Sequence, residues 1–178
     1  MNNHARGYTL IELIVAVGLF AFIMTIVSGA YIVMIGLVRH TQAMASGIDN
    51  LSFALESMTR SIRTGTGYGC GAPGVDCPNG GTAFFLTDMN GHPVSYGLSG
   101  SAITETTISG SYPLTDASAV QISSLTFYVS GTRPFSAGNT GQPYATIVVS
   151  GTVPSGGVND PPQSFTVETS AVMRGTDL

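Results

Sequence analysis

One acidic residue, Glu12, stands at the N-terminal edge of a long uncharged segment. Between Leu13 and Val38 the chain contains no Asp, Glu, Lys, Arg, His, Asn, Gln or Pro. As a helix this segment would be roughly 39 Å long, more than the ~30 Å hydrocarbon core of a bilayer requires and too long for the core of a signal peptide. A carboxylate at such a boundary is costly without a compensating partner, so Glu12 is a candidate functional residue. The alternative is that Glu12 only marks the membrane boundary.

The chain has two cysteines, Cys70 and Cys77, with six residues between them in a segment rich in Gly and Pro. Outside the cytoplasm such a pair is expected to form a disulfide that closes a small loop. In the chain-entropy model this bond stabilises the fold by roughly 2–3 kcal/mol. A metal site would need further ligands nearby, and a redox pair would favour two intervening residues. The disulfide therefore depends on an extracytoplasmic location.

No catalytic constellation emerges from the remaining polar residues. His92 is the one histidine of the C-terminal part, and nothing in its spacing pairs it with a nucleophile and a carboxylate, so a solvated turn residue is expected. Asp88, Asn90 and Gly91 resemble the start of a calcium loop, but the further acidic ligands and the closing Glu are missing. The sequence predicts no enzyme, no metal centre and no cofactor, and leaves open whether Asp88 and Asn90 bind calcium.

The charge of the chain narrows its partners. The formal net charge is −4, six arginines supply all the basic charge, and Lys is absent. Beyond Arg63 only Arg133 and Arg174 remain. Nucleic-acid binding needs clustered cations, so the composition argues against it. The uncharged Ser, Thr and Gly surface suits contact with other proteins, because few charges would need desolvation.

A second helical pattern follows the uncharged segment. Apolar residues recur every three or four positions, at Ile48, Leu51, Leu55, Met58 and Ile62. This periodicity predicts one continuous helix to about Arg63, whose outer half buries that stripe on a domain. Gly65 and Gly67 supply the stop signal, and Gly36 and Gly47 are expected to permit bending.

From Thr64 onward, short runs of β-branched and aromatic residues alternate with polar ones. The candidate strands are Ala83–Asp88, Pro93–Leu98, Ser101–Ser109, Ser124–Ser130, Tyr144–Val153 and Ser164–Met173. Asn90 and Gly91 predict a type I′ hairpin between the first two strands, and Ser155–Pro162 predicts an exposed loop. The length allows one modest core. The sequence thus predicts an α+β fold in which a long N-terminal helix packs on a C-terminal antiparallel β-sheet domain.

The stretch Gly7-Tyr8-Thr9-Leu10-Ile11-Glu12 and the aliphatic residues after it resemble the leader motif of type IV pilins and pseudopilins. The resemblance implies that a membrane-embedded aspartyl prepilin peptidase cuts between Gly7 and Tyr8 and N-methylates Tyr8. It also implies that Glu12 pairs with the α-amine of a neighbouring subunit during assembly. Opposite charges about 4 Å apart in a low-dielectric setting would offset much of their desolvation.

The resemblance divides the chain into four parts. Residues 1–7 are the leader, 8–38 the transmembrane and assembly helix, 39–63 its amphipathic continuation, and 64–178 an extracytoplasmic β-rich domain. The implied location is the bacterial cytoplasmic (inner) membrane, single-pass with the leader in the cytoplasm, and then a cell-surface filament or pseudopilus. This orientation rests on the motif, because Arg6 and His4 give a weak positive-inside signal. Implied partners are other pilin or pseudopilin subunits, the prepilin peptidase, the inner-membrane assembly platform and, before assembly, membrane lipid.

Three features indicate a minor subunit. Gly29 stands where major pilins usually carry a helix-breaking Pro, and Leu51–Arg63 and the closing segment Phe165–Arg174 resemble the J-type minor pseudopilin. The leading hypothesis is a structural subunit that primes, caps or decorates a type IV pilus or type II secretion pseudopilus. The alternatives are a tip adhesin or uptake module, and a membrane-anchored enzyme or sensor with an accidental motif. The sequence does not distinguish pilus from secretion system, and strand order is beyond its reach.

Overall fold

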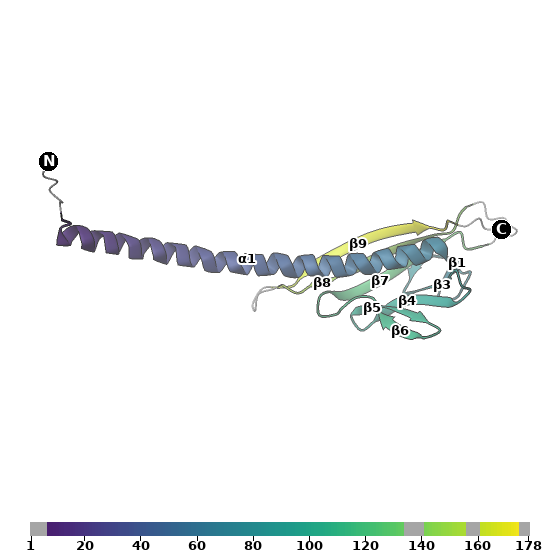
Figure 1. Cartoon of the computed structure of the whole chain (residues 1–178). Helices are drawn as coiled ribbons and strands as arrows, with labels where there is room; N and C mark the ends of the chain where they lie inside the picture. The colour runs from purple at the N-terminus through teal and green to yellow at the C-terminus, as the bar shows by residue number, and fades with distance from the viewer. Residues whose placement is uncertain (1–6, 134–140, 156–160, 175–178) are drawn as a thin grey trace, which may run out of the picture.

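One helix, α1 (Leu10–Thr64), spans almost the whole length of the molecule (Figure 1). The computed structural model describes residues 7–133, 141–155 and 161–174. The 55 residues of α1 correspond to a rod about 82 Å long. Thr9 caps the N-terminus of α1, and at the C-terminus the Gly65 N–H donates to the Ser61 carbonyl. The helix ends one residue beyond the predicted Arg63, and Gly65 is the stop.

The two halves of α1 have different surroundings. The N-terminal half extends beyond the β domain, and residues 10–34 are exposed on every side (Figure 1). The C-terminal half lies on the domain and buries Leu51, Ala54, Leu55, Met58 and Ile62. This confirms most of the predicted apolar stripe. Ile48 is the exception, because it is 53% exposed and Gly47 is buried in its place.

In the described part of the chain, nine strands form two antiparallel sheets. The five-stranded sheet has the order β1-β3-β4-β5-β6, and the four-stranded sheet has the order β2-β7-β8-β9. Their bounds are β1 (Thr66–Cys70), β2 (Cys77–Gly81), β3 (Ala83–Thr87), β4 (Pro93–Ser99), β5 (Ala102–Thr107), β6 (Gly110–Pro113), β7 (Gln121–Ser130), β8 (Tyr144–Val153) and β9 (Gln163–Val172). The predicted α+β fold, a long helix packed on an antiparallel domain, is confirmed.

Three strands were not predicted. β1, β2 and β6 are short, at five, five and four residues, and each is rich in Gly or contains Pro. Such compositions are typical of loops, and strands of this kind are tolerated mainly at sheet edges. All three lie at an edge of their sheet. The strand predicted over Ser101–Ser109 is shorter than expected and ends at Thr107. The chain then reverses direction, and Thr107 pairs with Gly110 of β6.

The predicted hairpin between β3 and β4 is confirmed, but its predicted type I′ turn is wrong. That turn requires positive φ at two central residues, but among the described residues only glycines have positive φ, and here it is Gly91 (φ 81°). The Gly91 N–H donates to the Asp88 carbonyl at 3.0 Å, and the Asp88 N–H donates to the His92 carbonyl at 2.9 Å. The Asp88 carboxylate also accepts the N–H groups of Asn90 and His92. An aspartate-stabilised turn therefore replaces the expected geometry.

The core lies where the two sheets and α1 meet. Phe84 of β3 and Phe127 of β7 stack at 5.5 Å between ring centroids, and Tyr68 of β1 tilts against Phe84 at 5.7 Å. These rings join the two sheets, and Met58 and Ile62 of α1 belong to the same cluster. The helix is thus part of the core of the domain.

Gly47 has a role that its helix position did not predict. A Cβ atom there would lie 2.7 Å from Cγ1 of Val153 and 3.0 Å from the Ala119 carbonyl oxygen. The absence of a side chain therefore lets α1 approach the end of β8 closely. Close packing explains this glycine, and bending at Gly36 and Gly47 stays a prediction.

Candidate processing and assembly site

Glu12 caps the start of α1 together with Thr9. The Thr9 N–H donates to Glu12 Oε2 at 3.1 Å, and the Thr9 hydroxyl lies 3.2 Å from the same oxygen. In return the Glu12 N–H donates to Thr9 Oγ1 at 3.3 Å. This reciprocal arrangement is a capping box, which satisfies backbone donors that have no partner within the helix. The Glu12 carboxylate thus has hydrogen-bond partners within its own chain.

From the sequence we expect the partner of Glu12 on a neighbouring subunit, and that expectation misses Thr9 of the same chain. The signal was present, because Thr-x-x-Glu before an apolar run is the sequence pattern of a capping box. The capping box lowers the cost of placing Glu12 at the membrane edge, because the carboxylate keeps hydrogen bonds there. Pairing of Glu12 with another subunit's amine stays a prediction.

The expected cleavage point lies just before this cap. Gly7 and Tyr8 precede α1 in non-helical backbone, and the Tyr8 side chain is 89% exposed. Apart from its own chain neighbours, no atom of the described residues lies within 4 Å of the position that a Cβ of Gly7 would take. Exposed, irregular backbone is what proteases cut readily, so this peptide bond is accessible to a peptidase. Residues 1–6 of the expected leader lie outside the described residues.

Among the described residues, α1 is the one helix long and apolar enough to cross a membrane. Its apolar part projects away from the domain, with Glu12 and the expected cleavage point at the far end (Figure 1). The candidate site therefore lies at the opposite end of the molecule from the sheets.

Cys70 and Cys77 are joined by a disulfide. Cys70 ends β1 and Cys77 begins β2, so the bond links an edge of the five-stranded sheet to an edge of the four-stranded sheet. The two sulfur atoms lie 3.7 and 3.4 Å from the Phe127 carbonyl oxygen of β7. The bond therefore ties the two sheets together beside the aromatic core.

Asp76, inside the disulfide loop, anchors that loop to the end of β7. Its Oδ1 accepts the N–H of Thr132 at 2.9 Å and the Thr132 hydroxyl at 2.7 Å. Burial opposes the charge of Asp76, but the hydrogen bonds from Thr132 and Gly131, with Arg133 nearby, outweigh it and lower its pKa below the usual value. No local pattern predicts this contact, because Asp76 and Thr132 lie 56 positions apart in the sequence.

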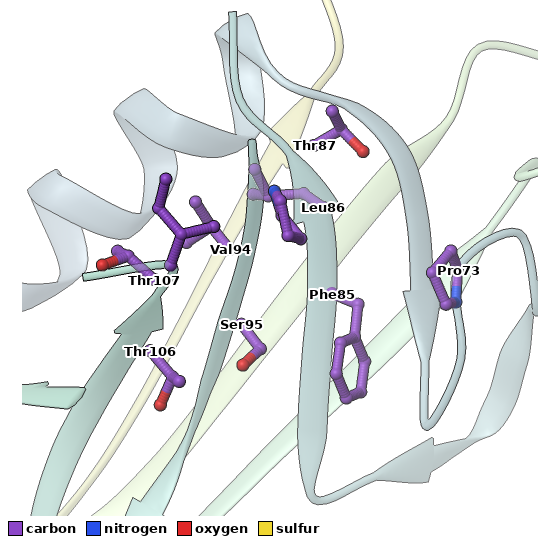
Figure 2. Close-up of a pocket in the computed structure, with 10 residues that line it drawn as sticks. Pro73, Phe85, Leu86, Thr87, Val94, Ser95, Thr106 and Thr107 are labelled. Carbon is purple, nitrogen blue, oxygen red and sulfur yellow. The ribbon is translucent and has the colours of Figure 1, made fainter. Parts of the chain in front are cut away.

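The outer face of the five-stranded sheet carries a shallow pocket of about 210 Å³ (Figure 2). Figure 2 shows Phe85, Ser95 and Thr106 on three neighbouring strands, with Pro73 of the disulfide loop beside Phe85. All ten lining residues are uncharged, and none is a histidine. This pocket could hold a small uncharged group, but it does not combine a nucleophile with a base.

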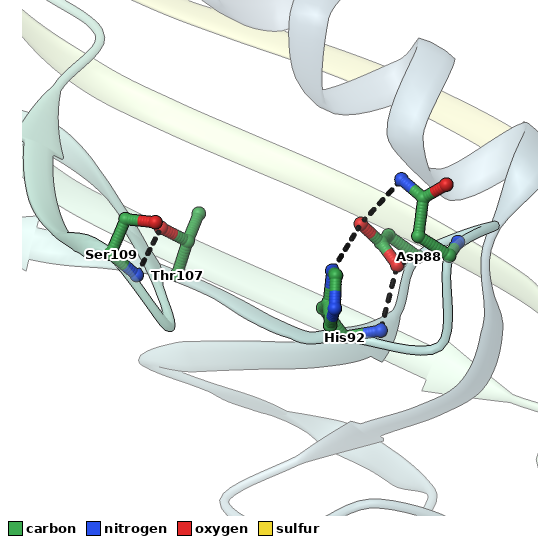
Figure 3. A network of polar contacts seen from close by, with 5 residues as sticks. Asp88, His92, Thr107 and Ser109 are labelled. Atoms are coloured by element: carbon green, nitrogen blue, oxygen red, sulfur yellow. Dashed lines mark hydrogen bonds and ion pairs between the residues drawn. The ribbon is translucent and has the colours of Figure 1, made fainter.

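The Asp88 carboxylate accepts hydrogen bonds from residues of its own turn (Figure 3). Besides the two backbone N–H groups, the carboxylate accepts from the Asn90 side chain at 3.4 Å, and His92 Nδ1 lies 3.8 Å from Oδ2. The backbone N–H of His92 is the main cause that lowers the pKa of Asp88. Within the described part of the chain no three His, Cys, Asp or Glu residues form a group that could hold a metal. The hydrogen bonds from the N–H groups of its own turn explain Asp88 without an ion.

Residues 2–28 match the family model described as Prokaryotic N-terminal methylation motif. The matched segment contains the expected cleavage point, Tyr8 and Glu12. This motif indicates a prepilin-like substrate of prepilin peptidase, and the apolar half of α1 that follows it is consistent with membrane anchoring. More specifically, the motif supports the resemblance to type IV pilins and pseudopilins, and it implies a structural subunit that assembles with other pilin subunits. No curated protein and no solved structure matches the chain.

Proposed function

We propose that this chain is a minor pilin or pseudopilin that is cut between Gly7 and Tyr8, N-methylated on Tyr8, and assembled into or at the tip of a filament. The filament is a type IV pilus or a type II secretion pseudopilus. Before assembly α1 spans the cytoplasmic membrane with the leader inside and the β domain outside, next to an inner-membrane assembly platform. The observation that carries this proposal is the uncovered apolar half of α1, which begins at the methylation motif.

The uncovered half of α1 requires an apolar environment. Burying one large aliphatic or aromatic side chain is worth about 1.5–3 kcal/mol. Leu19, Phe20, Phe22 and most of their neighbours on α1 are more than half exposed, so leaving this half in water would cost on the order of tens of kcal/mol. Lipid and a bundle of similar helices both remove that cost. The chain can therefore pass from membrane to filament with little change in apolar burial.

Glu12 can make the transfer from membrane to filament depend on cleavage of the leader. Cleavage after Gly7 creates an α-amine on Tyr8, next to the capping box in which Glu12 accepts from Thr9. At 4 Å such an amine and a carboxylate of another subunit attract by about 4 kcal/mol at an effective dielectric constant of about 20, before desolvation is counted. The pair is available only once the leader has gone, so processing would precede assembly.

Mass spectrometry of the protein from its native host tests the proposal. We expect a mature chain that begins at Tyr8 and carries one additional methyl group, present in a sheared filament fraction. A chain that keeps its N-terminal Met and stays in the membrane fraction would refute processing and assembly together. A deletion strain scored for filament number and for secretion then separates pilus from secretion function.

A second candidate function is display of a binding module, either a tip adhesin or an uptake receptor. The observation that favours it is the uncharged pocket between Phe85, Ser95 and Thr106, which lies on a sheet face turned away from the core. A deletion that abolishes surface attachment and leaves filament number unchanged would favour this function over a structural one.

A further inference from the structure

Three of the four sheet edges in the described structure are short or protected. β1 and β2 are the facing edges of the two sheets and are joined through the disulfide of Cys70 and Cys77. β6 has four residues and ends at Pro113, which has no N–H to donate. Short strands and proline are among the usual means by which proteins prevent pairing at an edge.

β9 is the exception. It has ten residues and pairs with β8 in continuous register from Gln163 to Val172, without a bulge. It contains no Pro, Lys or Arg, and Glu168 is its one charged residue. A long, regular edge of this kind is a template for another strand.

The register shows which backbone groups point away from β8. The Met173 N–H donates to the Pro143 carbonyl at 3.1 Å, so the odd-numbered residues of β9 are those that bond β8. The outward groups therefore belong to Ser164, Thr166, Glu168, Ser170 and Val172. Within the described chain, no backbone partner faces these groups. The next outward group, the Arg174 N–H, donates to the Arg63 carbonyl at 3.1 Å, where α1 closes the end of the edge.

β9 runs beside α1 (Figure 1). Gln163 lines a hollow with Leu37 and His40 of α1, whereas Arg174 meets the helix at Arg63, so β9 and α1 run in the same direction. The side chains of Phe165 and Val167 pack against the core but remain partly exposed. A strand added along this edge would therefore gain backbone hydrogen bonds and cover apolar surface at once.

We infer that the free edge of β9 receives an extended segment of a different protein subunit. A second copy that pairs through its own β9 does not fit, for two reasons, and its β6 edge offers only four residues. Antiparallel pairing of two β9 strands would point their α1 helices in opposite directions, which one membrane or one filament does not allow. Parallel pairing through the same edges would turn one sheet over and place Glu168 of one copy on the same face as Phe165 and Val167 of the other.

The side chains beside the free edge of β9 indicate which residues the added segment should carry. Its residues on the face shared with Phe165 and Val167 should be apolar or small, because that face continues the core. On the other face it should carry a neutral or basic residue beside Glu168, since a like charge there is destabilising. The inference deepens the proposed function, on which it rests, by naming the surface through which the subunit meets a partner outside the membrane.

The test is photo-crosslinking in the native host with the full chain. A benzophenone amino acid is placed in turn at positions 166, 168 and 170, whose side chains flank the free edge on the outer face. We expect all three to join one segment of a different protein, with the attachment point moving by two residues for each two-residue step. Crosslinks scattered over unrelated surfaces, or confined to a second copy, would overturn the inference.

A matched pair of variants tests the backbone contact itself. Ser170→Pro removes one outward N–H without removing a bond to β8, and it should lower crosslinking from position 166 about tenfold. Ser170→Ala keeps that N–H and should leave the yield nearly unchanged. Equal yields from the two variants would contradict strand addition. If Ser170→Pro fails to fold, the two-residue stepping in the chain with native Ser170 remains a sufficient test.

The same samples distinguish failure of the inference from failure of the proposed function. The N-terminal peptide reports whether the chain begins at a methylated Tyr8. A processed chain without stepped crosslinks would overturn only the strand addition. An unprocessed chain that still gives stepped crosslinks would overturn only the proposed processing.

Discussion

Two buried tyrosines of the core differ in their hydrogen bonding, and this difference predicts opposite effects of the same substitution. The Tyr68 side chain is 1% exposed, and its hydroxyl has no hydrogen-bond partner. The Tyr96 hydroxyl donates to Glu105 Oε1 at 2.8 Å. Burial raises the pKa of both phenols, so both stay neutral over any ordinary assay range.

The expected magnitudes follow from these contacts. A buried polar group without a partner costs about 1–3 kcal/mol, so Tyr68→Phe should stabilise the domain by about 1 kcal/mol. A hydrogen bond to a charged acceptor contributes about 1.5–3 kcal/mol, less where the acceptor is partly hydrated, so Tyr96→Phe should destabilise by about 1–2 kcal/mol. The free energies of unfolding of the two variants should therefore differ by about 2–3 kcal/mol, although each variant loses one tyrosine hydroxyl group.

Urea unfolding of the full chain in detergent micelles, followed by near-ultraviolet circular dichroism, measures this difference. Tyr128→Phe, at an exposed position of β7, is the control and should change stability by less than about 0.5 kcal/mol. If Tyr68→Phe destabilises the domain as much as Tyr96→Phe does, the Tyr68 hydroxyl has a partner such as a buried water molecule, and the reasoning is wrong.

Three further predictions concern the membrane end, the disulfide and the docking of α1. Glu12→Leu should leave cleavage before Tyr8 intact and reduce the amount of subunit in sheared filaments; equal recovery with the native chain would refute the role of Glu12 in assembly. Replacing Cys70 and Cys77 by Ser should destabilise the β domain by roughly 2–3 kcal/mol, measured by urea unfolding under oxidising conditions. Gly47→Val should destabilise by about 1–3 kcal/mol in the same assay through a clash with β8, whereas Gly36→Val, in open space, should not.

The sequence predicted most where local pattern decides structure. The uncharged run and the spacing of Leu51, Leu55, Met58 and Ile62 predicted the helix, because burial on one face follows from a helical period. The longer strands were predicted because β-branched residues alternate with polar ones in them. Thr9 could also have been found, since its spacing from Glu12 is a local capping pattern.

The remaining features depend on contacts between distant residues. The packing of Gly47 follows from Val153, and the role of Asp76 follows from Thr132, and no local pattern reveals either partner. The strand β2, whose sequence is CPNGG, forms because β7 lies beside it, although its composition favours a loop. Such tertiary effects commonly override local propensity in strands.

Several contacts fasten the C-terminal half of α1 to the β domain. Besides the core residues, Asn50 Oδ1 accepts the Asp116 N–H at 2.9 Å, and the Arg63 carbonyl accepts the Arg174 N–H at 3.1 Å. These two bonds hold α1 near both ends of its contact with the domain. Gly47, just before Asn50, lets α1 pack closely against the end of β8. A force applied to the uncovered half would therefore reach the domain through a continuous helix and a shared core. If the subunit passes from lipid into a filament as proposed, we therefore expect it to move as one body, with the free edge of β9 keeping its position relative to α1.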